Sequence, residues 1–171
     1  MKNIEDTEYY EDEVYHSRLL ISVRADRSEL AENVRAARAI LYSFPNTSII
    51  ITEHRLILDV KNPEYIIDGL IGDRKGVQSE KGIRSSFEKG KKQCCKVIVI
   101  DLDMNMGAYP LRTRKLAKEL YFRKCDIQNG IIERCYIVYH DKSVLLTKSH
   151  FTEEKDDSKS RIILELQKIA E

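Results

Sequence analysis

The sequence predicts one α/β (α+β) domain, in which helices flank a mixed β-sheet and a C-terminal hairpin and helix complete the chain. Three observations predict this fold class. The chain has 171 residues, of which 42% are hydrophobic, and this is enough for a single core. Apolar residues recur at helical spacing in some segments and at strand spacing in others. The nearly continuous apolar run 96–102 is typical of a strand that is buried on both faces.

The chain begins with an acidic segment. Residues 1–13 carry six acidic side chains against one lysine. A charge run of this kind predicts a solvated, flexible arm over 1–15. The remaining residues, 16–171, are expected to form a single domain.

The first elements of the domain are predicted from local patterns. A short strand over 19–23 precedes a helix whose start is marked by Asp26 and Glu29, which form a capping-box pattern. The β-branched runs 48–53 and 56–60 predict a hairpin. The helix that lies between the strand 19–23 and this hairpin is predicted by apolar residues at spacings of four, three, four and three: Leu30, Val34, Ala37, Leu41 and Phe44.

A second predicted hairpin joins 64–68 to 71–75, because Asp68-Gly69 is a strong turn signal. A helix follows from Ser79, and the strand 96–102 comes after it. The apolar face of this helix is predicted to contain Ile83, Phe87, Gly90 and Cys94.

The last third of the chain predicts a helix, a hairpin and a helix. The helix starts at Thr113, and the hairpin joins 134–139 to 144–147 about His140. A final amphipathic helix spans 162–169 after a charged loop. The complete order is helix, strands, helix, strand, helix, hairpin and helix, which predicts a mixed sheet with helices on its faces.

Composition excludes several classes of protein. No apolar run approaches the about 18–20 residues that a membrane span needs, and the acidic N-terminus lacks the apolar stretch of a signal peptide. We therefore expect no membrane partner and a cytoplasmic location, with the four cysteines as free thiols. A net charge of +1 excludes a histone-like polycation, but it does not exclude a basic patch that binds nucleic acid.

The hairpin after Pro63 carries the most informative group of charged residues. Side chains alternate along a strand, so Asp73 and Lys75 lie on the same face. With the turn at Asp68-Gly69, Glu64 is predicted to lie across from Asp73. Two carboxylates in this arrangement suit Mg²⁺ or Mn²⁺, and a neighbouring lysine suits the charge of a phosphate. The alternative interpretation is a surface hairpin whose charges pair with one another.

The residues that follow extend this pattern into a resemblance. The stretch Asn62-Pro63-Glu64-Tyr65-Ile66-Ile67-Asp68-Gly69 is followed by a helix that ends near Gln93 and by the strand 97–102. Together these resemble the C-terminal tRNA nuclease domain of contact-dependent growth inhibition (CdiA-type) polymorphic toxins. Several toxins of this type are similar to the PD-(D/E)XK nucleases, whose restriction-endonuclease-like core runs helix, β-meander, helix, strand.

The resemblance implies a role for each residue of the motif. Glu64 takes the position of the first acid, where the family usually has an aspartate, and Asp73 and Lys75 take the (D/E)-x-K positions. Gln93 is the polar residue of the second helix, which implies the catalytic set Glu64, Asp73, Lys75 and Gln93. Glu32 is implied as a supplementary acid, so that Glu32, Glu64 and Asp73 would hold Mg²⁺ or Mn²⁺.

The resemblance also implies an activity and its partners. The activity is metal-dependent hydrolysis of RNA, with tRNA as the expected substrate and an immunity (antitoxin) protein as a second partner. The charge pattern agrees with nucleic-acid binding, because two predicted helices are rich in lysine and arginine. The expected nucleic-acid contacts are Arg74, Lys89, Lys92, Arg114 and Lys118.

Three other functions stay open at this point, and one of them is an antidote or interaction protein in which the acidic arm matters more than the hairpin. His140, beside Asp141 at a predicted hairpin tip, could serve as the base of a metal-independent ribonuclease. Alternatively, the chain is a non-catalytic relative that keeps the scaffold in order to bind nucleic acid or protein.

Overall fold

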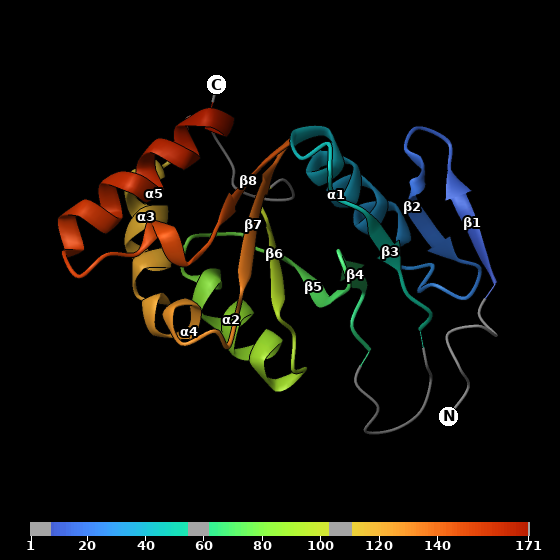
Figure 1. Ribbon diagram of the computed structural model, residues 1–171, viewed down its shortest axis with the longest axis horizontal. Helices are drawn as coiled ribbons and strands as arrows, with labels where there is room; N and C mark the ends of the chain where they lie inside the picture. The colour runs from blue at the N-terminus through green and yellow to red at the C-terminus, as the bar shows by residue number, and fades with distance from the viewer. Residues whose placement is uncertain (1–7, 55–61, 103–110, 171) are drawn as a thin grey trace.

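A computed structural model describes residues 8–54, 62–102 and 111–170 (Figure 1). Its centre is an eight-stranded mixed sheet, and the strands lie side by side in the order of the chain. Helices cover the sheet, which confirms the predicted α/β class. No helix among the described residues is long and apolar enough to cross a membrane.

Strands and helices alternate through most of the chain. The strands are β1 (Tyr9–Asp12), β2 (His16–Ser22), β3 (Ile49–Ile51), β4 (Tyr65–Ile67), β5 (Leu70–Gly76), β6 (Val97–Asp101), β7 (Arg134–Tyr139) and β8 (Lys142–Leu146). The helices are α1 (Leu30–Ser43), α2 (Gly82–Lys92), α3 (Thr113–Tyr121), α4 (Lys124–Gln128) and α5 (Lys155–Ala170), with a short 3₁₀ turn, η2, at Lys148–His150.

The pairing of the strands follows from the length of their connections. Short turns join β4 to β5 and β7 to β8, and each pair is antiparallel. The longer connections that contain α1, α2 and α3 join parallel neighbours, namely β2 with β3, β5 with β6 and β6 with β7. The predicted partner of 48–53, the run 56–60, lies outside the described residues. Among the described residues β3 pairs with β4.

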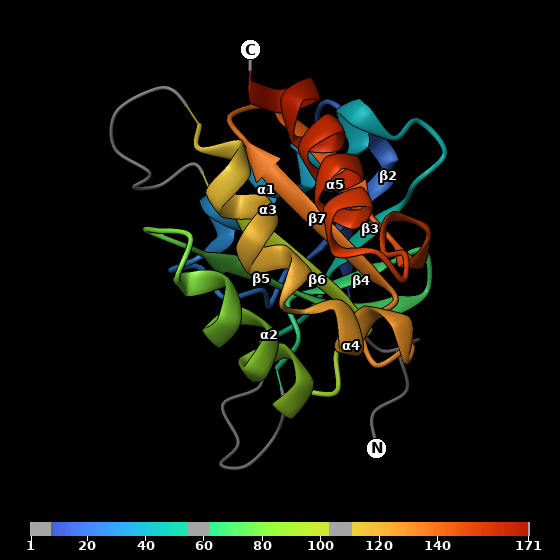
Figure 2. The ribbon, with the colours of Figure 1, turned by 90° about the vertical axis from the view of Figure 1, so that its left-hand side faces the viewer.

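Helices occupy both faces of the sheet (Figures 1 and 2). On one face, α1 packs against a cluster that includes Val97 and Val99. On the other face, α2, α3 and α5 pack against a cluster that includes Ile98 and Ile100. All five residues of β6 are buried, as the continuous apolar run predicts.

The end of α2 differs from the prediction at Cys94. Ile83, Phe87 and Gly90 are buried as expected, but Cys94 is exposed. The helix ends at Lys92, and Cys94 has a left-handed backbone with φ of 58°. It therefore leaves the apolar face that its spacing predicts.

Part of the segment expected to be a flexible arm, 1–15, is ordered; residues 1–7 of it lie outside the described residues. Residues 9–12 form β1, which pairs with β2 at the edge of the sheet. The Asp12 carboxylate is buried and lies 2.6 Å from a guanidinium nitrogen of Arg38 on α1. It also accepts hydrogen bonds from the backbone amides of Val14 and Tyr15. This carboxylate joins the first hairpin to the domain.

Replacement of Asp12 tests this connection. We expect Asp12→Ala to lower the free energy of unfolding by about 2–3 kcal/mol, because a buried charged hydrogen-bond acceptor is lost and Arg38 loses its partner. The exposed Glu13 is the matched control, and Glu13→Ala should change the free energy by no more than about 0.5 kcal/mol. Denaturant unfolding measures both. Equal, small effects would mean that 1–15 is an undocked arm.

Candidate functional site

A polar cavity of about 450 Å³ opens where β4 begins and β5 ends. The N-terminus of α1 and one side of α2 complete its walls. Its acidic residues are Glu29, Glu64 and Asp73. Its other polar side chains include Asn62, Lys75, Gln78, Ser79, Ser85, Ser86, Lys89 and Gln93.

The β4–β5 hairpin places the predicted residues as the turn requires. Tyr65 pairs with Gly72, so the next residues outward, Glu64 and Asp73, face each other across the strands. Asp73 and Lys75 share the α2 face of β5. The Lys75 ammonium forms an ion pair with the Asp73 carboxylate, which is only 2% exposed. The expected grouping of Glu64, Asp73 and Lys75 is therefore observed.

A third carboxylate comes from Glu29, which the sequence analysis did not select for the site. Glu29 precedes the first residue of α1, and its side chain hydrogen-bonds that of Glu64. Glu32, the expected supplementary acid, does not line the cavity. It lies one turn further along α1 and forms an ion pair of 3.2 Å with Arg35.

Glu64 is the electrostatic centre of this group. Burial, together with the Glu29 side chain and the charge of Asp73, raises the pKa of Glu64 to about 9. The hydrogen bond from Glu64 lowers the pKa of Glu29. The opposite directions of these two pKa shifts favour a proton on Glu64 rather than on Glu29.

The α2 side of the cavity supplies neutral and basic groups. Gln93 follows the last residue of α2 and lines the cavity, as predicted. Its carbonyl oxygen, Oε1, is buried and accepts no hydrogen bond from the described residues. The side chain of Lys89 is exposed at the same wall.

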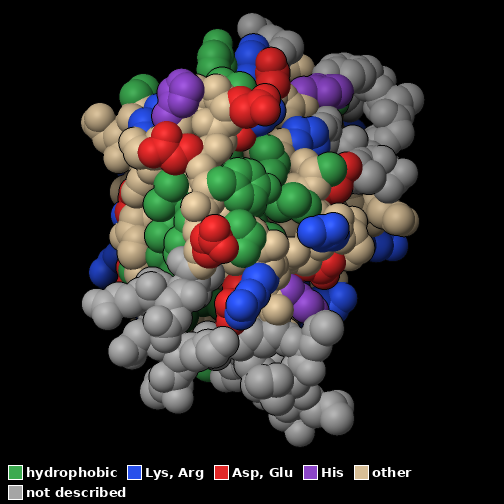
Figure 3. Space-filling view, turned by 90° about the vertical axis from the view of Figure 1, so that its right-hand side faces the viewer, with side chains coloured by type: hydrophobic (Ala, Val, Ile, Leu, Met, Phe, Trp, Pro, Cys, Tyr) green, Lys and Arg blue, Asp and Glu red, His purple; other side chains and the backbone are tan. Residues whose placement is uncertain are grey.

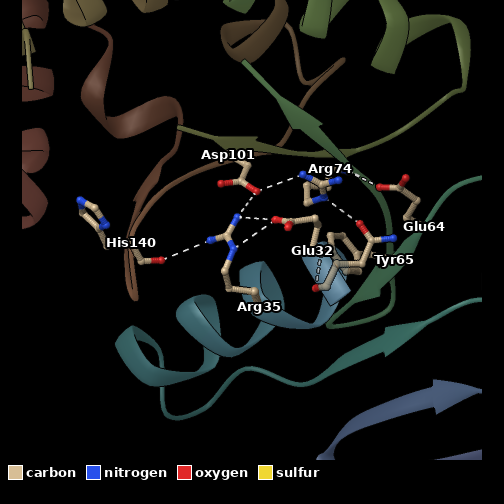
Figure 4. A network of polar contacts seen from close by, with 8 residues as sticks. Glu32, Arg35, Glu64, Tyr65, Arg74, Asp101 and His140 are labelled. Carbon is tan, nitrogen blue, oxygen red and sulfur yellow. Dashed lines mark hydrogen bonds and ion pairs between the residues drawn. The ribbon is translucent and has the colours of Figure 1, made fainter. Parts of the chain in front are cut away.

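Arg74 must be corrected as a nucleic-acid contact. It borders the cavity, but its side chain is only 9% exposed. Its guanidinium donates to the Asn33 side chain at 2.7 Å and to the Asp101 carboxylate at 3.0 Å (Figure 4). Because alternate residues of β5 face opposite sides of the sheet, Arg74 points away from Asp73 and Lys75.

The other expected nucleic-acid contacts remain accessible. Lys89, Lys92, Arg114 and Lys118 are all exposed. They lie on α2 and α3, which cover the same face of the sheet (Figure 2). An ion pair between Arg112 and Glu80, with atoms 2.7 Å apart, links the segments that lead into these two helices.

His140 lies away from the cavity. It occupies the β7–β8 turn, and its ring contacts that of Tyr139 in a tilted arrangement with ring centres 4.3 Å apart. Its backbone carbonyl accepts a hydrogen bond from Arg35, and the Arg35 and Asp101 side chains lie between it and Glu64 (Figure 4). The geometry gives His140 no place among the cavity residues.

A second hollow, of about 400 Å³, lies on the α1 side of the sheet. Apolar side chains gather on the corresponding face of the molecule (Figure 3). Its lining includes Val14 and Tyr42, which are 57% and 66% exposed. It has no pair of carboxylates among the described residues that line it, so it does not share the chemistry of the polar cavity.

The described residues contain no group of three histidine, cysteine, aspartate or glutamate side chains arranged to hold a metal ion. The candidate donors for a cation are thus the facing carboxylates of Glu64 and Asp73. Cys95, near Asp73, is a poor nucleophile, because burial raises the pKa of its thiol to about 12.

Comparison with known proteins adds no relative. No family model matches the chain, and no curated protein or solved structure matches it. The cavity is therefore interpreted from its own geometry.

The proton on Glu64 predicts how stability depends on pH. The pKa of Glu64 is near 9 in the folded protein and near 4.5 in the unfolded chain, so its contribution to stability is full below pH 4.5 and is lost as pH rises towards 9. Glu64→Gln removes this titration. We expect the variant to become more stable than the wild type between pH 5 and pH 8, by at most about 1.4 kcal/mol per pH unit.

Thermal unfolding across this pH range measures the difference. Glu133→Gln, at an exposed glutamate, is the matched control and should follow the wild type at every pH. A Glu64→Gln curve parallel to that of the wild type would show that Glu64 is ionised in the folded protein.

Proposed function

We propose that this protein is a metal-dependent endoribonuclease that hydrolyses phosphodiester bonds in RNA, with tRNA as the expected substrate. The observation that carries the proposal is the position of Glu64 opposite Asp73, beside Lys75, in one polar cavity. Two acidic groups and a lysine in this arrangement serve to bind a cation and a phosphate. A structural ion pair alone would not need a second carboxylate buried against the first.

The connectivity around the cavity supports the proposal. α1 is followed by the antiparallel strands β3, β4 and β5, then by α2 and the parallel strand β6. This is the order of a restriction-endonuclease-like core. The resemblance of the hairpin to CdiA-type toxin nucleases points to the same chemistry, although fold analogy alone does not establish an activity.

The donor set suits Mg²⁺ or Mn²⁺. Mg²⁺ is commonly held by one or two protein carboxylates, with water and substrate phosphate completing its shell. Glu64 and Asp73 provide two such groups, and the proton held by Glu64 indicates that this place needs a positive charge. When bound, the cation would polarise the scissile phosphate and lower the pKa of a bound water.

The remaining residues of the cavity have separate roles in this proposal. The Lys75 ammonium orients the attacking water and stabilises the negative charge that develops on the phosphate. Glu29 lies beside Glu64 and accepts its hydrogen bond, and a proton released from Glu64 on cation binding would pass to solvent. Gln93 lines the α2 wall of the cavity, where its side chain would brace the metal site, since its Oε1 is buried.

RNA would reach the cavity along α2 and α3. The exposed Lys89 stands at the wall of the cavity, and Lys92, Arg114 and Lys118 extend the basic surface. In this setting the protein acts in the cytoplasm, where its four free thiols stay reduced. A cognate immunity protein is the second partner that the proposal implies.

The direct test is incubation of the purified protein with a tRNA pool at low salt, with Mg²⁺ or with EDTA, followed by gel analysis. We expect cleavage that EDTA stops. Asp73→Asn should abolish it, because it removes the ionised carboxylate that binds the cation, while Asp156→Asn on the exposed surface of α5 should not.

Each other outcome supports a different function. Cleavage that survives EDTA and is lost in His140→Ala would favour the metal-independent ribonuclease. RNA binding without cleavage would favour a non-catalytic relative. Full activity of Asp73→Asn would contradict the proposed site.

Lys75 and Lys89 are expected to affect different steps. Lys75→Ala should lower kcat by about 10²–10³-fold, because it removes one electrostatic stabiliser of the transition state. Lys89→Ala should leave kcat nearly unchanged, raise KM, and reduce the slope of log affinity against log salt by about 0.7–0.9, as expected for one lost phosphate contact. Steady-state kinetics at several salt concentrations separates the two effects. Equal losses of kcat would contradict the assignment.

A further inference from the structure

A charged network lies behind the cavity, on the α1 face of the sheet (Figure 4). Its centre is Asp101, the last residue of β6, whose side chain is fully buried. The Asp101 carboxylate contacts the guanidinium groups of both Arg35 and Arg74. Arg35 comes from α1 and also donates to the backbone carbonyl of His140. The network therefore ties together α1, β5, β6 and the β7–β8 turn.

Arg74 connects this network to the cavity. Its guanidinium is held by Asp101 at 3.0 Å and by Asn33 of α1 at 2.7 Å. Its backbone amide donates to the Glu64 carboxylate at 3.0 Å. β4 begins only at Tyr65, so the Glu64 side chain serves as the partner of an amide that lies beyond the end of the β4 ladder. One residue thus contacts the buried network with its side chain and the candidate cation site with its main chain.

The position of Asn33 reinforces this connection. Asn33 is buried on α1, and its backbone carbonyl accepts a hydrogen bond of 2.6 Å from the Tyr65 hydroxyl. Tyr65 directly follows Glu64. The residues next to both facing carboxylates, Tyr65 beside Glu64 and Arg74 beside Asp73, are therefore bound to the same turn of α1.

We propose that Asp101 is a positioning residue: through Arg74 it fixes the segment of β5 that carries Asp73 and Lys75, and with it the orientation of the Glu64 carboxylate. This inference rests on the proposed function, because it assigns the carboxylates a cation to hold. It concerns a residue that lies outside the cavity lining.

The energetic cost of burying the Asp101 carboxylate supports such a role. A buried ion pair contributes little net stability, because desolvation offsets its attraction, and apolar residues at such positions are often equally stable. The packing of β6 alone does not require a carboxylate at its end. A ligand-holding site, by contrast, needs its side chains fixed within about 0.5 Å by surrounding hydrogen bonds. Two guanidinium groups on one carboxylate provide that restraint directly behind β5.

The test compares the full chain with its Asp101→Asn variant, which keeps the shape of the side chain and removes its charge. The probe is Mn²⁺ alone, with binding followed by electron paramagnetic resonance. We expect the Mn²⁺ dissociation constant to rise by about 10–100-fold, the usual effect of losing a residue that orients a ligand. The second readout is hydrogen exchange at the Arg74 amide by NMR, which should become faster in the variant.

Asp12→Asn is the matched control. Asp12 is also a buried carboxylate that pairs with an arginine of α1, but it lies in β1, at the edge of the sheet. It should destabilise the protein without changing the Mn²⁺ constant by more than about twofold or changing exchange at Arg74. If Asp101→Asn and Asp12→Asn have the same effects on both readouts, the positioning role is refuted.

Asn33→Ala provides a second variant if Asp101→Asn does not fold. It removes the other side-chain contact of the Arg74 guanidinium, and alanine is favourable in a helix. Both readouts should move in the same direction as for Asp101→Asn. Unchanged Mn²⁺ binding and unchanged exchange in Asn33→Ala would overturn the inference.

The two proposals can fail separately. If the wild type binds no Mn²⁺, the proposed metal-dependent activity is refuted, and exchange at the Arg74 amide still decides whether Asp101 fixes this segment. If the wild type binds Mn²⁺ and the Asp101→Asn variant binds it equally well, with unchanged exchange, the positioning role fails while the cation site stands.

Discussion

The alternation of side chains along β5 is the constraint on which the site depends. Because successive residues of a strand point to opposite faces, Asp73 and Lys75 reach the α2 side, while Arg74 between them reaches the α1 side. A single strand therefore carries two cavity residues on one face and, on the other, a residue bound to Asn33 and Asp101. The short Asp68-Gly69 turn fixes the register that brings Glu64 opposite Asp73. A shift of one residue would exchange the two faces.

Burial of like charges gives the cavity its electrostatic character. Lys75 offsets the charge of Asp73, whereas burial, Glu29 and Asp73 together raise the pKa of Glu64. A carboxyl group that is neutral only because of its neighbours loses its proton readily when a divalent cation binds in the place of that proton. Under the proposed function, binding of a cation would therefore be coupled to release of a proton. The proximity of Glu64 to Asp73 on which this depends follows from the pairing of β4 with β5.

Local sequence patterns predict the helices and strands well, and tertiary packing decides which side chains reach the cavity. The register of the β4–β5 hairpin follows from the Asp68-Gly69 turn. The face shared by Asp73 and Lys75 follows from the alternation of side chains along a strand. The position of Glu29, rather than Glu32, in the cavity does not follow from the sequence. Both lie at the start of α1, and only the packing of α1 against the sheet brings Glu29 next to Glu64. Arg74 shows that charge alone is a poor guide to nucleic-acid contact. Because side chains alternate along β5, Asp73 and Lys75 share one face and Arg74 lies on the opposite face, where it is largely buried. The docking of the acidic N-terminus depends on a contact with a distant part of α1, which composition cannot reveal.

The two faces of the sheet bury charge for different reasons. On the α2 side the carboxylates line a polar cavity that a ligand can enter. On the α1 side the Asp101 side chain is fully buried and pairs with the guanidinium groups of Arg35 and Arg74. Under the proposed function the carboxylates of the cavity need a fixed support, since a cation held by only two protein carboxylates tolerates little displacement of either. Arg74 is the residue that would transmit this support, because its amide is bound to Glu64 while its side chain is bound to Asp101.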